Sequence, residues 1–300
     1  MKDYRALRQQ PPGQAVTDQV IPNVQWFPGH MKKAKDIIVN NLKLVDVVIE
    51  LLDARIPYSS ANPMLQEIIA GKPRLVALNK SDLADRAVTK QWVEYFKKQG
   101  VPAVAVDAPQ GRGIKQLVAM TEELARPMTD KLVSKGAKAR AARVMILGIP
   151  NVGKSSLINR LAGSNKAKTA DKPGVTRAKQ WIRLGGNLEL LDTPGILWPK
   201  FDDEAVGLRL AYIGSINDEI LNVADIAVEL IKFLQANYCN TLAQRYNIEG
   251  AGDPVQVIAQ IAEKRQCIKK GGELDYDKAA ALLMDDFRSG KLGRITLETP

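Results

Sequence analysis

The eight residues 148–155 limit what this chain can fold into more than any other stretch. They read Gly-Ile-Pro-Asn-Val-Gly-Lys-Ser, follow an apolar run at 143–147 and precede a helix-like segment at 156–161. A strand, a glycine-bounded loop and a helix are the context in which the pattern G-x-x-x-x-G-K-[ST] holds phosphate groups. The sequence therefore predicts an α/β domain with a phosphate-binding loop at the end of one strand.

Each residue type in this loop suits a nucleotide polyphosphate. Gly148 and Gly153 let the backbone curl, so that successive N–H groups and the positive end of the helix point at the ligand. The Lys154 ammonium would reach the β- and γ-phosphates, and the Ser155 hydroxyl would ligate Mg²⁺. The residues expected to bind the phosphates are Asn151, Val152, Gly153, Lys154, Ser155 and Ser156.

Length and composition are those of a soluble globular protein. The 300 residues suggest two domains, and 45% hydrophobic with 25% charged residues is an ordinary balance. Asp46 and Glu50 interrupt the most apolar stretch, so no segment approaches the roughly 18 apolar residues of a membrane helix. The first residues lack an apolar signal core, which favours a cytoplasmic protein with no membrane partner. Cys239 and Cys267 lack metal-ligand spacing and are expected to be reduced thiols.

The net charge of +10 is concentrated in the first two-thirds of the chain. Basic residues outnumber acidic ones by 32 to 19 in residues 1–203, whereas acidic residues outnumber basic ones by 14 to 11 in residues 204–300. An excess of positive charge favours a polyanionic partner, most simply RNA, although many basic proteins have none. If RNA is bound, residues 1–203 should carry much of the electrostatic attraction.

Apolar runs alternate with helix-like segments before the phosphate loop. The strand-like runs are 45–52, 74–78 and 101–106, and the helical segments are 32–44, 63–70, 89–99 and 113–126. This alternation predicts a mostly parallel sheet covered by helices on both faces. Ligands of such sheets lie beyond the carboxyl ends of the strands, so the residues that follow each strand are candidates for the site.

Two polar turns after these strands fit a guanine base. Asn79-Lys80-Ser81-Asp82 follows the second strand, and the Asp82 carboxylate can accept hydrogen bonds from N1–H and the exocyclic amino group of guanine. Asn79 and the Lys80 stem would support the base and the loop. Asp107-Ala108 follows the third strand, where a backbone N–H can meet the guanine oxygen. An ordinary polar turn would look the same, but a phosphate loop in the same sheet favours the guanine site.

Residues beyond the phosphate loop are suited to sense a γ-phosphate. A polar loop ends in Pro173-Gly-Val-Thr176, and the Thr176 hydroxyl can ligate Mg²⁺ when a γ-phosphate is present. Strands are expected at 180–184 and 188–191, and the second ends in Asp192-Thr-Pro-Gly195. Asp192 is placed to hold the water shell of Mg²⁺, and the Gly195 amide to meet the γ-phosphate.

The order of these motifs is unusual for a GTPase. The usual order places the phosphate loop first and N-K-x-D last, whereas here residues 79–82 precede residues 148–155 and 192–195. No second N-K-x-D follows Gly195, and residues 165–168 fail because the fourth residue is a lysine. The domain is therefore expected to be circularly permuted, which preserves a site when the former termini lie close together.

The rest of the chain is assigned by composition and periodicity. The basic segment 127–142 is expected to be a connector, either solvated or in contact with RNA. A basic cluster at 264–270 is either a phosphate contact or a set of cations at a helix C-terminus. From residue 204 onward helices alone are expected, at 204–213, 218–236, 239–246, 254–266 and 276–288. The predicted parts are a flexible tail at 1–22, a permuted GTPase domain at 23–203 and a helical C-terminal domain at 204–300.

In these motifs and in their order, the chain resembles the bacterial ribosome biogenesis GTPase A family. The resemblance rests on the motif order and phosphate loop, and on Trp26-Phe-Pro-Gly-His-Met31, Pro173-Gly-Val-Thr176, Asp192-Thr-Pro-Gly-Ile196 and Gly290-Lys-Leu-Gly-Arg-Ile-Thr-Leu297. It implies a GTPase that assists late assembly of the large ribosomal subunit, binds its rRNA and is stimulated by that particle. Asp107-Ala108 departs from the Ser-Ala of many relatives, but the backbone contact should survive.

The catalytic group that orients the attacking water is not obvious. Many GTPases place Gln directly after D-x-x-G, but this chain has Ile196, so its intrinsic turnover should be slow. His30 is the only histidine, and a lone histidine is usually structural. The resemblance nevertheless raises His30 as the missing group, beside Lys154, Thr176 and Gly195. It also implies that Asn151 helps to ligate K⁺ near the phosphates, which would supply positive charge there.

Two other functions remain open. The chain could be a nucleotide-gated RNA-binding module in which turnover is incidental, or a permuted GTPase that serves another RNA or protein machine. In each case the expected ligands are GTP or GDP with Mg²⁺, and the free protein is expected to be monomeric.

Overall fold

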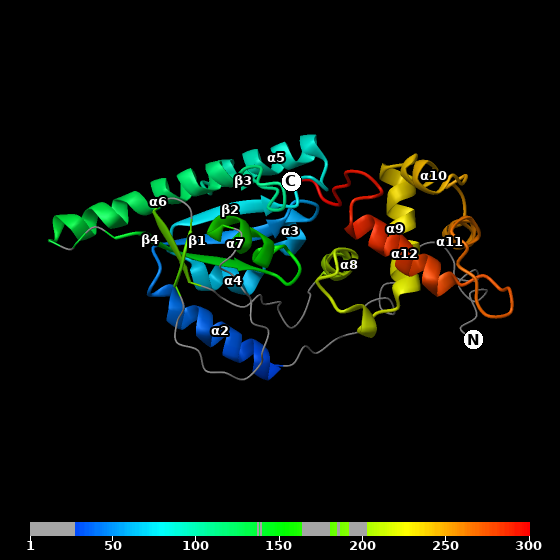
Figure 1. Ribbon diagram of the computed structural model, residues 1–300, viewed down its shortest axis with the longest axis horizontal. Coiled ribbons are helices and arrows are strands. Elements are labelled where there is room, and N and C mark those ends of the chain that lie inside the picture. Colours follow the sequence, from blue (N-terminus) through cyan, green and yellow to red (C-terminus); the bar gives the residue numbers. More distant parts are fainter. Residues whose placement is uncertain (1–27, 137, 139, 164–180, 185–186, 192–202) are drawn as a thin grey trace. The chain divides into compact units, whose positions relative to one another are not determined.

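The computed structural model describes residues 28–136, 138, 140–163, 181–184, 187–191 and 203–300 (Figure 1). These residues form two compact units. The sheet unit contains the described residues from 28 to 191 together with 296–300, and the helical unit contains residues 203–295. None of the helices in these ranges combines the length and the apolar character that a membrane span requires.

Six strands of the described residues form one sheet. They are β1 (Val47–Asp53), β2 (Arg74–Asn79), β3 (Ala103–Ala105), β4 (Ala142–Gly148), β5 (Trp181–Arg183) and β6 (Leu188–Leu191). Their spatial order is β3-β2-β1-β4-β6-β5, with every neighbouring pair parallel except β5 and β6. The mostly parallel sheet expected from the sequence is therefore confirmed. All seven residues of the central strand β1 are buried, as its nearly continuous apolar run requires.

The register of the sheet brings the ends of three strands together. Asp53 at the end of β1 pairs with Asn79 at the end of β2, and Leu51 pairs with Gly148 at the end of β4. The N-K-x-D turn and the phosphate loop therefore leave the sheet on either side of β1, at the same edge.

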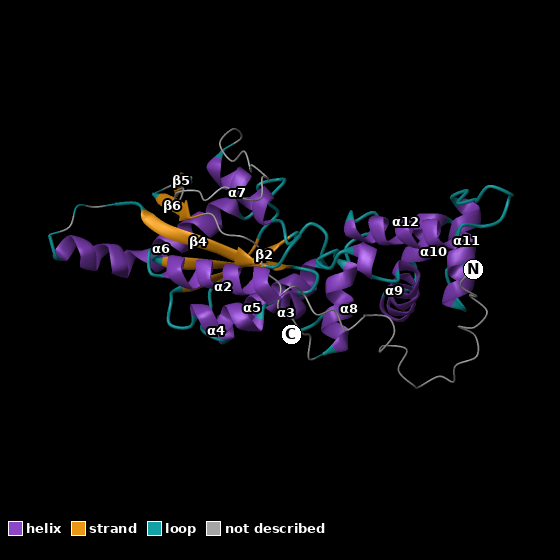
Figure 2. Ribbon diagram, turned by 90° about the horizontal axis from the view of Figure 1, so that it is seen from below, coloured by secondary structure: helices purple, strands orange, loops and turns teal. Residues whose placement is uncertain are grey.

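Helices cover both faces of the sheet. On one face Ile38 of α2 (Pro28–Leu42) and Leu65 of α4 (Pro63–Ile69) join an apolar cluster with residues of β1 and β4. Trp92 of α5 (Arg86–Lys98) belongs to a second cluster with β1, β2 and β3. Figure 2 shows α7 (Lys154–Ala162) on the opposite side of the sheet from α2 and α4. The long helix α6 (Ile114–Ser134) contacts β1, β2 and β4.

Side-chain caps fix where several helices begin. The carbonyl oxygen of Asn62 and the carboxylate of Asp85 accept hydrogen bonds from the first N–H groups of α4 and α5. In the helical unit Asp253 and Asp275 do the same for α11 (Pro254–Lys264) and α12 (Tyr276–Arg288). These short polar side chains satisfy N–H groups that have no partner within the helix.

Three helices differ from the sequence expectation. The sequence predicts that α6 ends at Arg126 before Pro127, but the helix continues to Ser134, so the expected connector 127–142 begins as helix. Proline lacks one backbone donor, and the hydrogen bonds beyond it can resume. The segment expected as one helix at 218–236 is a 3₁₀ turn, Asp218–Ile220, followed by α9 (Val223–Asn237). The short helix α3 (Pro57–Ser60) is not predicted by periodicity.

The helical unit contains α8 (Glu204–Tyr212), α9, α10 (Thr241–Tyr246), α11 and α12, and no strand among its described residues. Helix α12 packs against α8, α9 and α11. Its Asp286 is almost fully buried and accepts hydrogen bonds from Arg245 and Tyr246 at 2.8 and 3.1 Å, while Lys291 lies 3.2 Å away. These partners satisfy a carboxylate that would be costly to bury alone.

Residues 296–300 leave the helical unit and rejoin the sheet unit. The sequence predicts one helical domain over 204–300, and the structure differs from this at residues 296–300. The physical reason is that Leu297 is buried in the sheet unit, where its N–H donates a hydrogen bond to the main-chain oxygen of Arg55 at 2.8 Å.

Candidate nucleotide site at the carboxyl ends of the strands

The phosphate loop connects β4 to α7, where the sequence predicts it. Val152 is fully buried beneath the loop, Lys154 is partly buried, and Ser155 and Ser156 in the first turn of α7 are exposed. Gly153 stands at the N-cap of α7 and brings no side chain that could cap this turn. The start of α7 therefore has the form of an anion site, with N–H groups and the positive helix end directed outward.

Both glycines of the loop are required by the space around them. Gly153 has a φ of 94°, a left-handed conformation that favours glycine. A Cβ on Gly153 would lie 2.3 Å from Nδ2 of Asn79. A Cβ on Gly148 would lie 2.7 Å from the main-chain oxygen of Leu51. The loop can follow this path, close to β1 and β2, only because these two residues have no side chain.

Asn79 joins three segments that are far apart in the sequence. Its side-chain N–H donates to the main-chain oxygen of Val152 in the phosphate loop at 2.8 Å. Its side-chain oxygen accepts from the main-chain N–H of Ala108 at 3.3 Å. Asn79 is itself buried at the end of β2. One amide thus fixes the phosphate loop and the turn after β3 to the N-K-x-D motif.

Lys80 makes a second link to the phosphate loop. Its Nζ donates to the main-chain oxygen of Asn151 at 2.6 Å and lies 3.1 Å from the carboxylate of Asp53. Its φ is 57°, a left-handed value that is uncommon outside glycine and asparagine-like residues. Burial lowers the pKa of the Lys80 ammonium and the Asp53 carboxylate opposes this effect.

Asp53 and Arg55 form a buried ion pair under this lysine. The Arg55 guanidinium donates from two nitrogens to the Asp53 carboxylate at 2.9 and 2.8 Å, and the Arg55 N–H adds a third hydrogen bond at 3.0 Å. Burial alone would raise the pKa of Asp53, but Arg55 and Lys80 outweigh it and hold the pKa well below its usual range. A charged carboxylate is therefore fixed directly behind the N-K-x-D motif.

The remaining residues of the predicted base site lie at the same edge. Asp82 is partly buried and follows Lys80 by two residues. Asp107 is fully buried, and its carboxylate accepts a hydrogen bond from the Gln110 N–H at 3.0 Å. Because the Ala108 N–H already donates to Asn79, its predicted contact with the guanine oxygen would share that hydrogen bond. The Ala108 carbonyl accepts from Nε of Arg160 at 2.9 Å.

Several predicted residues cannot be placed in this geometry. Thr176, Asp192 and Gly195 lie outside the described residues. His30 lies in the first turn of α2, which begins at Pro28, four residues before the start at Lys32 that the sequence predicts. Within the described residues no cluster of three or more His, Cys, Asp or Glu side chains could hold a metal ion. The exposed Ser155 hydroxyl, a hard oxygen donor, fits Mg²⁺ as one ligand of a shared set.

Three residues of the site are missed by the motif analysis. Asp53 pairs with Lys80, Arg55 pairs with Asp53, and Arg160 of α7 supports the turn after β3. Asp53 could have been found from its position at the carboxyl end of a buried strand, where ligands and their supports collect. Nothing in the local sequence points to Arg160, because its contact depends on the fold.

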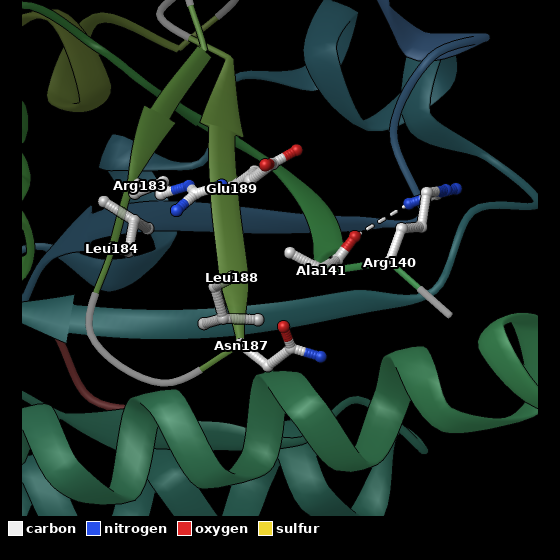
Figure 3. A pocket seen from close by; sticks show the side chains of 7 residues that line it. All are labelled: Arg140, Ala141, Arg183, Leu184, Asn187, Leu188 and Glu189. Atoms are coloured by element: carbon white, nitrogen blue, oxygen red, sulfur yellow. Dashed lines mark hydrogen bonds between the residues drawn. The ribbon is translucent and has the colours of Figure 1, made fainter. Parts of the chain in front are cut away.

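Two cavities lined by described residues of the sheet unit lie elsewhere. One, of about 410 Å³, is lined by residues at the amino end of β4 and around the turn from β5 to β6 (Figure 3). Its Arg140 donates to the Ala141 carbonyl and to the Asp46 carboxylate. Another, of about 570 Å³, lies at the amino ends of β2 and β3. Both lie at the amino ends of strands, whereas the loop that follows Gly148 lies at the carboxyl ends. The candidate site is therefore assigned from the motifs and their contacts, and not from these two cavities.

Comparison with known proteins agrees with this geometry. The family model described as RsgA GTPase matches residues 26–201, more than half of the chain. The model described as 50S ribosome-binding GTPase matches residues 143–260. The first model includes both segments that Asn79 contacts, at Ala108 and at Val152, whereas the second includes only the one at Val152.

Relatives match over nearly the whole chain. Ribosome biogenesis GTPase A of Bacillus cereus is 54% identical over 278 residues, covering 92% of this chain and 94% of the relative. The protein of the same name from Thermotoga maritima is 32% identical, covering 92% and 95%. Mitochondrial ribosome-associated GTPase 1 of Mus musculus is 34% identical, covering 91% and 90%. The solved structure of GNP-bound YlqF from T. maritima superimposes with a TM-score of 0.62 at 31% identity, covering 89% of this chain and 98% of that one.

Proposed function

The chain belongs to the ribosome biogenesis GTPase A family, and from that premise we propose that it assists late maturation of the large ribosomal subunit. Membership makes it a guanine-nucleotide-binding GTPase of ribosome biogenesis. Beyond this, we propose that the protein acts on the large ribosomal subunit, binds its rRNA and changes state with the bound nucleotide. The name 50S ribosome-binding GTPase, carried by the model that matches residues 143–260, supports the choice of the large subunit.

The observation that carries the proposal is the double hydrogen bond of Asn79. It holds the Val152 carbonyl on one side and the Ala108 N–H on the other. The N-K-x-D turn, the turn after β3 and the loop that follows Gly148 therefore meet in one place, although the order of the motifs along the chain is reversed. A permuted GTPase needs this meeting, and a chance occurrence of the two motifs would not produce it.

The base and phosphate contacts follow from this arrangement. We assign guanine recognition to Asp82, with Asn79, Lys80, Asp107 and Ala108 as supporting residues. The phosphates are assigned to the loop and helix start, and the residues are Asn151, Val152, Gly153, Lys154, Ser155 and Ser156. The glycine at the N-cap of α7 supports this assignment, because it lets a ligand approach the N–H groups of a helix start, which suit the charge of a polyphosphate.

Two cations belong to the proposed site. Ser155, Thr176 and Asp192 would hold Mg²⁺ and its water shell, and the ion would neutralise charge that develops on the phosphates. A potassium ion near Asn151 would add positive charge on the other side. Asn151 has a φ of 60°, and its main-chain oxygen accepts a hydrogen bond from Lys80. Its backbone is therefore held in place, while its side chain is exposed and can reach a cation.

Hydrolysis is proposed to depend on the ribosomal particle. Ile196 cannot orient water, so the group that does so must come from elsewhere. His30 is proposed for this task, with Lys154, Thr176 and the Gly195 amide stabilising the transferred phosphate. The backbone of His30 belongs to the first turn of α2, so the helix supports this residue.

The electrostatics support an RNA partner. The excess of basic over acidic residues in 1–203 favours contact with a phosphate backbone. Basic residues of the α6 extension, such as Lys131, and of the cluster at 264–270 are candidates for further contacts. We propose a cytoplasmic protein that is monomeric when free.

The test is GTP hydrolysis by the purified protein, alone and with purified large or small ribosomal subunits, in potassium and in sodium buffer. We expect slow basal turnover that rises many-fold with the large subunit and potassium only. No rise with either subunit, but nucleotide-dependent RNA binding, would instead favour a nucleotide-gated binding module. Stimulation by the small subunit would move the function to another particle, and equal rates in sodium would remove the K⁺ site.

A further inference from the structure

Residues 296–298 are buried against the segments that flank the N-K-x-D motif. Thr296, Leu297 and Glu298 are 5%, 5% and 8% exposed. They belong to the sheet unit, although the whole helical unit precedes them in the chain. A buried carboxylate such as that of Glu298 needs hydrogen-bond partners, and these partners show which parts of the sheet unit the segment contacts.

Glu298 and Leu297 fix the segment that follows β1. The Glu298 carboxylate accepts hydrogen bonds from the N–H groups of Tyr58 and Ser59 at 2.8 and 3.1 Å, and also from the Ser59 hydroxyl. The Leu297 N–H donates to the Arg55 carbonyl at 2.8 Å. The Arg55 side chain binds the Asp53 carboxylate, which in turn pairs with Lys80, so Leu297 is connected to the lysine through Arg55 and Asp53.

Thr296 fixes the other side of the motif. Its hydroxyl oxygen accepts a hydrogen bond from the main-chain N–H of Asp85 at 2.9 Å. Asp85 caps α5 and stands three residues after Asp82. On the same side, the indole N–H of Trp92 in α5 donates to the main-chain oxygen of Glu298 at 3.1 Å. The backbone that carries Asp82 is therefore held between residues 79–80 and a fixed helix start.

We infer that Thr296 and Glu298 are positioning residues for guanine recognition, acting on Asp82 and Lys80 through the backbone on both sides of N-K-x-D. The inference rests on the base site proposed above. It assigns a role in nucleotide binding to a segment that lies more than a hundred positions beyond the motifs of the phosphate site. Loss of either contact should loosen the base-reading turn and leave the phosphate loop in place.

The experiment compares two nucleotides by calorimetry on the full chain. GDP carries the exocyclic amino group that Asp82 is expected to read, and inosine diphosphate lacks it. Thr296→Val removes the hydroxyl but keeps the shape, and Glu298→Gln removes the charge. We expect each to weaken GDP binding roughly five- to tenfold, as the loss of one or two backbone supports implies, and to weaken binding of inosine diphosphate less. The GDP preference of the protein should therefore fall.

Two matched variants make this result specific. Thr296→Ser keeps the hydroxyl and should restore the GDP preference. Thr299→Val makes the same chemical change at an exposed position three residues away and should leave both affinities unchanged. Circular dichroism melting would show whether each variant is folded, and Thr296→Val keeps the question answerable if Glu298→Gln fails to fold.

The outcomes separate this inference from the site on which it rests. Equal weakening of both nucleotides by Thr296→Val would show that residues 296–298 only stabilise the fold, which overturns the inference. Asp82→Asn supplies the reference. If it abolishes the GDP preference while Thr296→Val and Glu298→Gln do not change it, the base site stands and the positioning role is wrong. If Asp82→Asn leaves the preference intact, the base site itself is wrong.

Discussion

Lys80 and Asn151 are 71 positions apart in the chain, yet the lysine Nζ donates a 2.6 Å hydrogen bond to the asparagine main-chain oxygen. The same ammonium lies 3.1 Å from the Asp53 carboxylate. One cation therefore connects the end of β1, the N-K-x-D turn and the loop that follows Gly148.

Asp53→Asn should destabilise the sheet unit strongly. It leaves Arg55 and Lys80 without their shared carboxylate, and loss of one partner of a buried ion pair costs about 3–5 kcal/mol. Urea unfolding followed by tryptophan fluorescence measures the change. Lys232→Gln is the matched control, because it breaks an exposed ion pair with Glu229 and should cost less than about 1 kcal/mol. A similar small cost for Asp53→Asn would contradict the structural role of this carboxylate.

The stability of the protein should depend on pH through Asp53. Its pKa is lower in the folded protein than the value of about 3.9 in an unfolded chain, so the unfolded state binds the proton first as the pH falls. The stabilisation is thus complete above about pH 5 and is lost as the pH drops toward the folded pKa. We expect the free energy of unfolding to fall between about pH 5 and pH 3, and to fall less steeply in Asp53→Asn. Asp286, whose pKa is also lowered, contributes equally to both proteins.

Gly153→Ala should disable nucleotide binding. The new Cβ would lie 2.3 Å from the Asn79 amide, so either the loop or the amide must move, and the left-handed φ adds strain of about 1–2 kcal/mol. We expect GDP affinity, measured by calorimetry, to fall at least tenfold, roughly the effect of losing the Asn79 hydrogen bond. Gly163→Ala has the same sign of φ with no atom of the described residues within 4 Å, so this variant should show the strain but keep its affinity. Equal effects of the two variants would argue against the contact with Asn79.

Asp82→Asn should change which base the protein prefers. An amide offers a donor where guanine also has a donor, so GTP binding should weaken roughly 10- to 100-fold. Xanthosine triphosphate has an oxygen at that position and should bind better than it does to the unchanged protein. Competition against a fluorescent nucleotide measures both affinities. If GTP affinity stays the same, the N-K-x-D motif at 79–82 does not read the base.

His30→Ala should separate binding from stimulated turnover. GTP affinity should stay unchanged, whereas the rate in the presence of large subunits should fall by about 10²–10⁴, the usual contribution of a positioned acid or base. A malachite green assay with and without particles measures the rate. Persistence of the stimulated rate would remove His30 from the catalytic residues.

The sequence predicts much of the fold because its strands are strongly patterned. β1 and β4 are apolar runs that end at Asp53 and at Gly148, the first residue of the phosphate loop. Because such runs alternate with helical segments along the chain, a parallel sheet is expected. The prediction ends α6 at Arg126 because proline usually breaks a helix, and it misses α3 because four residues show no period. Both errors concern elements that depend on their surroundings more than on local preference.

The motifs likewise predict which residues of the site come together, but not what holds them. The sequence predicts Asn79 and Lys80 at the carboxyl end of a parallel strand, and in the structure both donate hydrogen bonds to the loop that follows Gly148. The support from Asp53, Arg160 and Thr296 depends on contacts across the sheet or from residues far along the chain. Such partners have no local signature, since a single aspartate, arginine or threonine is compatible with many environments.

The return of residues 296–298 to the sheet unit has a consequence for synthesis. Between Leu191, the last described residue of β6, and Thr296, the translating ribosome must add the entire helical unit. At about 5–20 residues per second this takes roughly 5–20 s, during which the sheet can form while Trp92 and the start of α3 await their partners. A nascent chain would therefore hold guanine nucleotides weakly until these residues emerge. Competence to switch would arrive only after the helical unit has been made.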